Sequence, residues 1–248
     1  MQRRRRVRSV VSELGDGRRI AYSDVGTRQT EWELTLGGLS ATEMAAVEEL
    51  FESTYGRWRT FTFLEPAGNL LAQSEEYGAP EWDNGPLLEL TPGIDDPFGG
   101  TRAVRVFNAG IVAADVAQTL LVPGQFHYCL SVWARQNNGP EVSLFASTTG
   151  STVTNTCPLT TQWQRFLSPV ALGVETESVT FGVTLGEAIG VDLFGMQVDA
   201  QLAPGGYQRT STGGGVHGHA RFASDVATVR AQGTDVFDSA IRIISKGN

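Results

Sequence analysis

Residues 31–66, EWELTLGGLSATEMAAVEELFESTYGRWRTFTFLEP, carry the clearest local signals of the chain. Apolar residues at every second position of 32–36 predict a strand with one buried face, which Gly37 and Gly38 are expected to end. Residues 59–64 alternate Phe and Thr and predict a second strand that Pro66 stops. The run therefore predicts a strand on either side of the stretch that follows Gly38.

That stretch predicts a helix at 41–55. Ser40 stands three residues before Glu43, the spacing of a capping box in which each residue satisfies a backbone N–H of the other. Gly56 is placed to take a positive φ just after the helix. Four apolar residues at helical spacing predict a stripe facing a core: Met44, Val47, Leu50 and Phe51.

Composition sets the broad class of the protein. A chain of 248 residues with 41% hydrophobic residues can bury one large all-β domain or two ordinary domains. There is no apolar run near 18 residues and no apolar segment after the basic start, so we expect neither membrane insertion nor a secretory signal, with synthesis and assembly in a cytoplasm. Cys129 and Cys157 are interpreted as two buried free thiols.

Charge divides the chain into two parts. The net charge of −8 argues against a nucleic-acid partner. Residues 69–201 hold 4 basic and 14 acidic residues, whereas the rest holds 15 basic and 13 acidic residues. This composition break indicates an acidic segment inserted into a different structural unit.

The N-terminus predicts a hairpin with a basic leader. Strands are expected at 7–14 and 18–23, joined by a turn at 15–17. Two interpretations stay open for the leading arginines, namely contact with an acidic partner surface or nucleic acid, and a merely solvated or frayed terminus. They are Arg3, Arg4, Arg5, Arg6 and Arg8.

The rest of the chain is predicted to be mainly β. Short strands separated by turn signals indicate a β-sandwich, most simply a jelly roll; they lie at 87–90, 101–108, 116–121, 127–135, 142–147, 164–170, 178–185 and 191–202. Further strands are expected at 207–212, 216–222, 225–230 and 239–245. Because neither chain end can build a core alone, we predict one discontinuous frame domain, a small β-sandwich or barrel with one helix, from 1–66 and 203–248, with the jelly roll inserted at 67–202.

Two families resemble these segments. GLSATEMAAVEELFESTYGRWRTFTFLEPAGNLL and GGYQRTSTGGGVHGHARFASD resemble distal tail proteins of tailed bacteriophages, in which a small β domain with one helix forms a ring. WDNGPLLEL, DPFGGTRAVRV, YCLSVWAR, TTQWQRF and VDLFGMQVDAQL resemble the carbohydrate-binding-module-like jelly rolls of phage tail and fibre proteins. Together these resemblances cover nearly the whole chain.

The resemblance implies a virion structural protein at the phage tail tip. It would form a closed ring with itself, with a hexamer favoured, and would join the tail tube to the tail hub and the host-recognition parts. The inserted module would bind host-surface glycan or act as a spacer. The alternative is a carbohydrate-binding adhesin of the tail-fibre type without a ring role.

Catalytic and metal sets are sparse in the sequence. Glycosidase chemistry needs two facing carboxylates, which sequence neighbours such as Glu75 and Glu76 cannot supply, so we expect no enzyme activity. His217 and His219 have a metal-ligand spacing but are interpreted as ordinary strand residues. We expect no cofactor, with a structural calcium ion as the alternative; its candidate ligands are Asp95, Asp96 and Asp192.

Sugar binding needs an aromatic platform with hydrogen-bonding neighbours, because a pyranose has one apolar face and many hydroxyls. Tyr77, Trp82 and Phe98 lie in loop-like stretches rich in Asp, Asn and Gly and are the predicted platform residues. Trp133 and Trp163 lie in or beside predicted strands. We expect these two indoles in the core.

Overall fold

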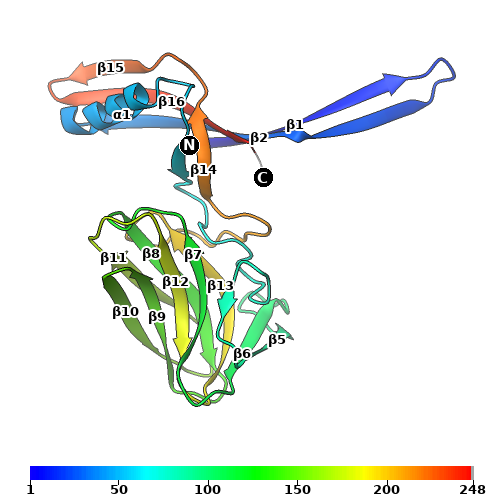
Figure 1. Cartoon of the computed structure of the whole chain (residues 1–248), viewed down its shortest axis with the longest axis vertical. Helices are drawn as coiled ribbons and strands as arrows, with labels where there is room; N and C mark the ends of the chain where they lie inside the picture. Colours follow the sequence, from blue (N-terminus) through cyan, green and yellow to red (C-terminus); the bar gives the residue numbers. More distant parts are fainter. Residues whose placement is uncertain (247–248) are drawn as a thin grey trace. The chain divides into compact units, whose positions relative to one another are not determined.

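The computed structural model describes residues 1–246, and the chain divides into two compact units (Figure 1). The frame unit comprises Met1–Phe63 and His217–Asn248, and the sandwich unit comprises Leu64–Val216. The second segment of the frame is predicted to start at residue 203, whereas in the structure residues 203–216 belong to the sandwich unit. The strand predicted at 207–212 is wrong, since that segment has no regular secondary structure.

The frame unit contains a six-stranded sheet in the order β1-β2-β16-β14-β3, with β15 paired to β16. The strands predicted at 18–23 and 32–36 are parts of the single strand β2. Gly37 and Gly38 do not end β2, because its pairing with β16 continues past them through a register shift. The strands are β1 (Gln2–Glu13), β2 (Arg19–Leu39), β3 (Phe61–Leu64), β14 (Val216–Phe222), β15 (Thr228–Gly233) and β16 (Val236–Lys246).

A long hairpin, β1–β2, extends past the rest of the frame sheet (Figure 1). Within residues 1–246, strand β16 pairs with β2 between Gln29 and Leu39, and the described ribbon beyond Gln29 has two strands. The expected basic leader is not a separate arm, because the arginines lie within β1. Arg6 Nη2 is 2.6 Å from Glu31 Oε2, so part of this positive charge is balanced within the chain.

Helix α1 (Ala41–Ser53) confirms the capping box predicted for Ser40 and Glu43. Gly56 has the expected positive φ of 60°, and Tyr55 before it also has a positive φ of 50°. The expected apolar stripe is only partly buried: Met44 is buried, whereas Leu50 is exposed. Within residues 1–246, no helix is long and apolar enough to cross a membrane.

The core of the frame unit is small. Among the described residues it consists of Trp32, Phe63, Ala220 and Ile243, with a few partly buried neighbours. The ring centroids of Trp32 and Phe63 are 5.0 Å apart. His217 packs on Trp32 at 4.4 Å, which agrees with its interpretation as a strand residue of the sheet.

The sandwich unit has two five-stranded sheets. Sheet I has the order β10-β9-β12-β7-β4, and sheet II has the order β11-β8-β13-β6-β5. The strands are β4 (Asp83–Asn84), β5 (Leu88–Ile94), β6 (Ala103–Asn108), β7 (Ala114–Leu120), β8 (His127–Gln136), β9 (Glu141–Thr148), β10 (Ser151–Pro158), β11 (Gln164–Ala171), β12 (Val179–Leu185) and β13 (Gly190–Asp199).

The strand order confirms the predicted jelly roll. When the eight strands from β6 to β13 are renumbered 1 to 8, sheet II reads 1-8-3-6 and sheet I reads 2-7-4-5. This is the order that results when a long hairpin rolls into two Greek keys. Strand β10 was not predicted, because as an edge strand it exposes most of its side chains and has few apolar residues.

The two sheets enclose one large core. It includes the inward residues of β8 and β13, such as Leu130 and Leu193, and the inward residues of β9 and β12, such as Leu144 and Phe181. Cys129 and Cys157 are buried free thiols, as predicted. Burial raises the pKa of both thiols, so they remain protonated near neutral pH.

Candidate functional site

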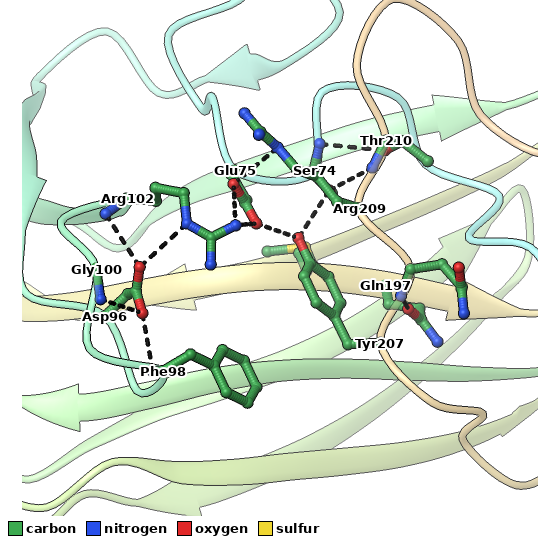
Figure 2. A network of polar contacts seen from close by, with 12 residues as sticks. Ser74, Glu75, Asp96, Phe98, Gly100, Arg102, Gln197, Tyr207, Arg209 and Thr210 are labelled. Atoms are coloured by element: carbon green, nitrogen blue, oxygen red, sulfur yellow. Dashed lines mark hydrogen bonds and ion pairs between the residues drawn. The ribbon is translucent and has the colours of Figure 1, made fainter.

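A buried carboxylate, Glu75, organises the polar network shown in Figure 2. Its side chain is 2% exposed and lies in the loop between β3 and β4. It accepts hydrogen bonds from Arg102 Nη1 at 2.9 Å and Tyr207 Oη at 2.9 Å, and forms an ion pair with Arg209 Nε at 3.0 Å. The β3–β4 loop, the β5–β6 loop and the segment after β13 thus meet at one carboxylate.

Asp96 holds Arg102 from the other side. It lies in the β5–β6 loop and accepts hydrogen bonds from the backbone N–H groups of Phe98 at 2.8 Å and Gly100 at 3.1 Å, and from Arg102 Nε at 3.2 Å. Burial alone would raise the pKa of Asp96. The backbone hydrogen bonds and the charge of Arg102 outweigh burial and hold this pKa below its usual value.

Tyr207 connects this network to the sheet. Burial raises the pKa of its phenol well above the usual value, so it remains protonated and donates to Glu75. Ser74 Oγ lies 2.9 Å from Tyr207 Oη and accepts from Thr210 N–H at 3.0 Å. These contacts hold the segment after β13 against the sandwich (Figure 2).

The outer face of sheet II carries an aromatic cluster. Because Leu130, Val132 and Ala134 of β8 point into the core, the residues between them point outward. Four rings pack mainly edge to face, with centroid distances of 5.3–6.0 Å: Phe98, Trp133, Phe194 and Tyr207. A Cβ at Gly195 would lie 2.9 Å from the Tyr207 ring, so a larger residue there would displace Tyr207.

Four arginines of the sandwich unit lie in or beside this face: Arg102, Arg105, Arg135 and Arg165. Three guanidinium groups stack on aromatic rings: Arg165 on Trp133 at 4.5 Å, Arg135 on Trp163 at 4.8 Å, and Arg102 on Phe194 at 5.1 Å. Buried Asp192 binds Arg105 Nε at 2.7 Å and Arg135 Nε at 2.9 Å. The positive charges are therefore largely balanced by buried carboxylates.

A cleft of about 690 Å³ opens beside Glu75, and we call it the Glu75 cleft. Its charged wall contains Arg102 and Arg209, whose side chains are 41% and 54% exposed. Its apolar lining comes from the loop after Glu75 and from β5: Ala79, Pro80, Leu90 and Pro92. The cleft combines guanidinium N–H donors with an apolar surface.

Two of the three predicted platform residues are buried. Tyr77 is 0% and Trp82 is 5% exposed; they pack on each other at 5.0 Å, so neither offers a ring face to solvent. Phe98 is 61% exposed and lies at the edge of the aromatic cluster. The prediction that Trp133 and Trp163 are core residues is wrong, because both are partly exposed on the outer side of sheet II.

The predicted calcium ligands do not come together. Asp96 pairs with Arg102, whereas Asp192 pairs with Arg105 and Arg135, and Asp95 is exposed. Among the residues described, no group of three or more His, Cys, Asp or Glu side chains could hold a metal ion.

The sequence interpretation did not identify Glu75, Arg102 and Arg209 as a site. One signal was available for the sheet face: Trp133-x-Arg135 and Trp163-x-Arg165 place an indole and a guanidinium on the same side of an extended chain. No comparable local signal marks Glu75, because its partners are 27 and more residues away in sequence.

No family model and no curated protein sequence matches the chain. Several solved structures are similar to about half of it. The enzymatically active domain of bacteriophage CBA120 tailspike protein 4 matches 54% of this chain and 22% of that domain, with 10% identity and a TM-score of 0.44. TmCBM61 in complex with β-1,4-galactotriose matches 54% of this chain and 99% of its own, with 15% identity and a TM-score of 0.44. The CBM22-1 xylan-binding domain of Paenibacillus barcinonensis Xyn10C matches 56% and 99%, with 13% identity and a TM-score of 0.44.

Proposed function

We propose that the sandwich unit binds carbohydrate in the Glu75 cleft and that the chain is a structural protein of a bacteriophage tail tip. The observation that carries the binding role is the pair Arg102 and Arg209, held on one buried carboxylate at the wall of the cleft. Their exposed N–H groups are fixed in direction, which lowers the entropic cost of binding sugar hydroxyls. The apolar wall at Leu90 and Pro92 suits the apolar face of a pyranose ring.

We further propose that the cleft binds without cleaving. A retaining or inverting glycosidase needs a protonated acid and a second free carboxylate on opposite sides of the glycosidic bond. Glu75 accepts from arginine and tyrosine, and Asp96 is held by Arg102 and by backbone N–H groups. Of the two carboxylates in the cleft lining, Glu75 is occupied by these contacts, which leaves exposed Glu76 alone, whereas glycosidase chemistry needs a facing pair.

The frame unit supports the structural role in a virion. On the β1–β2 ribbon beyond Gln29, Val11 is exposed on one face, and Ile20 and Tyr22 are exposed on the other. An isolated two-stranded ribbon is marginal in water, and β1 presents an unpaired edge. We propose that neighbouring copies cover the ribbon in a closed ring, with a hexamer favoured, between the tail tube and the hub of the virion. The sequence resemblance to distal tail proteins supports this arrangement.

Arg209→Ala tests the binding role. Glu75 keeps Arg102 and Tyr207 in this variant, and Arg209 is largely exposed, so the fold should lose at most about 1 kcal/mol. On an array of bacterial surface glycans, we expect the intact protein to bind and Arg209→Ala to bind at least about tenfold more weakly. The matched control is Arg230→Ala, which makes the same charge change on exposed β15 of the frame unit.

Two results would contradict the proposal. Equal binding by the intact protein and Arg209→Ala would place any glycan site outside the cleft, and an array without bound glycan would remove the binding role. Release of reducing ends from a bound polysaccharide would contradict the non-catalytic part alone.

A further inference from the structure

The outer face of sheet I carries a second cavity of about 420 Å³, which lies apart from the Glu75 cleft on the opposite sheet. Its floor is formed by β7, β9 and β12, and its wall by residues 83–87. Because Val116, Leu144 and Val183 point into the core, the residues between them on the same strands point to this outer face. The cavity is therefore built on a rigid, paired part of the jelly roll.

Strand register places hydroxyl groups in two rows across this face. One row runs from β10 to β7 and contains Thr152, Ser147, Thr180 and Thr119; the other contains Thr156, Ser143, Thr184 and Asp115. Thr180 Oγ1 lies 2.8 Å from Thr119 Oγ1, and Thr184 donates to Asp115 Oδ1 at 2.6 Å. Directly paired residues share a face of the sheet, so each row is continuous.

Between the rows lies an apolar trough. Across β9, β12 and β7 it consists of Phe145, Gly182 and Ala117. A Cβ at Gly182 would lie 2.8 Å from Phe145 Cε1 and 2.6 Å from the carbonyl oxygen of Val116. A side chain at position 182 would therefore collide with the Phe145 ring, so glycine is needed there for the ring to pack against the sheet.

The charged groups in the lining are hydrogen-bond acceptors. Asp83 and Asp115 supply two exposed carboxylates, and the lining contains no cation. Asn84 pairs with Val116, so its side chain lies on the core side of sheet I, where its Nδ2 donates to the carbonyl oxygen of Tyr77 at 2.7 Å. The cavity therefore offers acceptors to a ligand that donates hydrogen bonds.

We propose that this cavity is a second saccharide-binding site, specific for neutral sugars, so that one sandwich unit can hold two sugar units at once. The apolar trough would receive the apolar face of a pyranose, and the hydroxyl rows with Asp83 and Asp115 would bind its hydroxyls. Two exposed carboxylates without a counter-ion repel an acidic sugar, which sets this site apart from the arginine-rich Glu75 cleft. This inference extends the carbohydrate role but does not need the Glu75 cleft to bind.

The test is ¹⁵N-resolved NMR titration of the full chain with maltohexaose, cellohexaose and the acidic hexamer of galacturonic acid. We expect at least one neutral hexamer to shift the amide signals of Ala117, Phe145 and Thr180, and the acidic hexamer to leave them unchanged. Ser147→Trp should fill the cavity and weaken this binding at least tenfold. Ser143→Trp is the matched control, on the same strand and face but outside the cavity lining.

The Arg209→Ala variant separates this proposal from the first one. Neutral hexamers that shift the sheet I amides equally in the intact chain and in Arg209→Ala would support a site independent of the Glu75 cleft. The proposal would be overturned if these signals did not move with either neutral hexamer, if they moved more with the acidic hexamer, or if Ser147→Trp bound as well as Ser143→Trp.

Discussion

The frame unit and the sandwich unit obtain their stability in different ways. The sandwich has a core cluster of 28 buried residues among those described, whereas the frame cluster has four. Burial of apolar surface is the dominant favourable term in folding, so the sandwich can fold by its own core. The frame has the best local signals of the chain, including the capping box of α1, but little core to support them.

This difference shows that a segment can have strong local sequence signals for its helices and strands without a large core to bury them. The helix α1 leaves Leu50 exposed, and the β1–β2 hairpin exposes Val11 on one face and Ile20 and Tyr22 on the other. A unit with well-specified elements and a small core is suited to assembly, because neighbouring chains can complete the burial. The sandwich needs no such help and can present its two outer faces to ligands.

The largest expected effect is loss of the frame fold in Trp32→Ala. Trp32 is fully buried and contacts both Phe63 and His217, so its loss removes the centre of a four-residue cluster. Truncation of a buried aromatic costs about 3–5 kcal/mol, which is comparable to the whole stability of a marginal unit. Hydrogen exchange read by mass spectrometry should show lost protection in β2 and β16 and unchanged protection in the sandwich.

Phe181→Ala is the matched substitution in the sandwich. It should cost a similar 3–5 kcal/mol but leave the unit folded, because the surrounding core remains. Equal loss of protection in both units after either substitution would show that they unfold together, and the comparison would fail.

A smaller effect, on self-association, is expected when exposed apolar residues of the β1–β2 hairpin are replaced by serine. Ile20 and Tyr22 lie two residues apart on one strand and share a face of the ribbon. The double variant Ile20→Ser with Tyr22→Ser should leave the monomer folded and weaken self-association at least a hundredfold, since each buried side chain contributes about 1.5–3 kcal/mol. Light scattering after size exclusion measures the mass, and Leu121→Ser, exposed on the sandwich, is the control. Ring formation unchanged by the double variant would exclude this face of the hairpin from the interface.

Much of the fold could be predicted because its signals are local. The capping box at Ser40, the strand at 61–64 and most sandwich strands follow from spacing and alternation alone. Strand β10 and the packing of 203–216 could not be predicted in the same way. Edge position weakens the alternation of β10, and the segment 203–216 is held by side chains such as Tyr207 instead of by a strand ladder.

The candidate sites were harder to predict than the fold. Tyr77 and Trp82 have loop-like neighbours in sequence, but the loop folds inward and buries both rings. The Glu75 network joins residues up to 136 positions apart, and the sheet I cavity depends on cross-strand register. Neither relation exists until the sheets have formed, so no local pattern could reveal it.

The smallest expected effect is a pH-dependent change in stability when one ion-paired aspartate in each unit is replaced by asparagine. Asp96 in the sandwich is buried and hydrogen-bonded, and its pKa is below the usual value of 3.8. A carboxyl group with a lowered folded-state pKa stabilises the fold above its unfolded pKa, and this contribution is lost as pH falls through the folded pKa. Asp96→Asn should therefore cost about 1–3 kcal/mol at pH 7, and this deficit should shrink below about pH 4.

Asp225 in the frame also has a lowered pKa, chiefly from its hydrogen bond with Arg57, but the pair is solvent-exposed and screened by salt. Denaturant unfolding of Asp96→Asn and Asp225→Asn at pH 7 and pH 3 measures both responses, and an equal deficit in the two variants would contradict the contrast between a buried and an exposed ion pair.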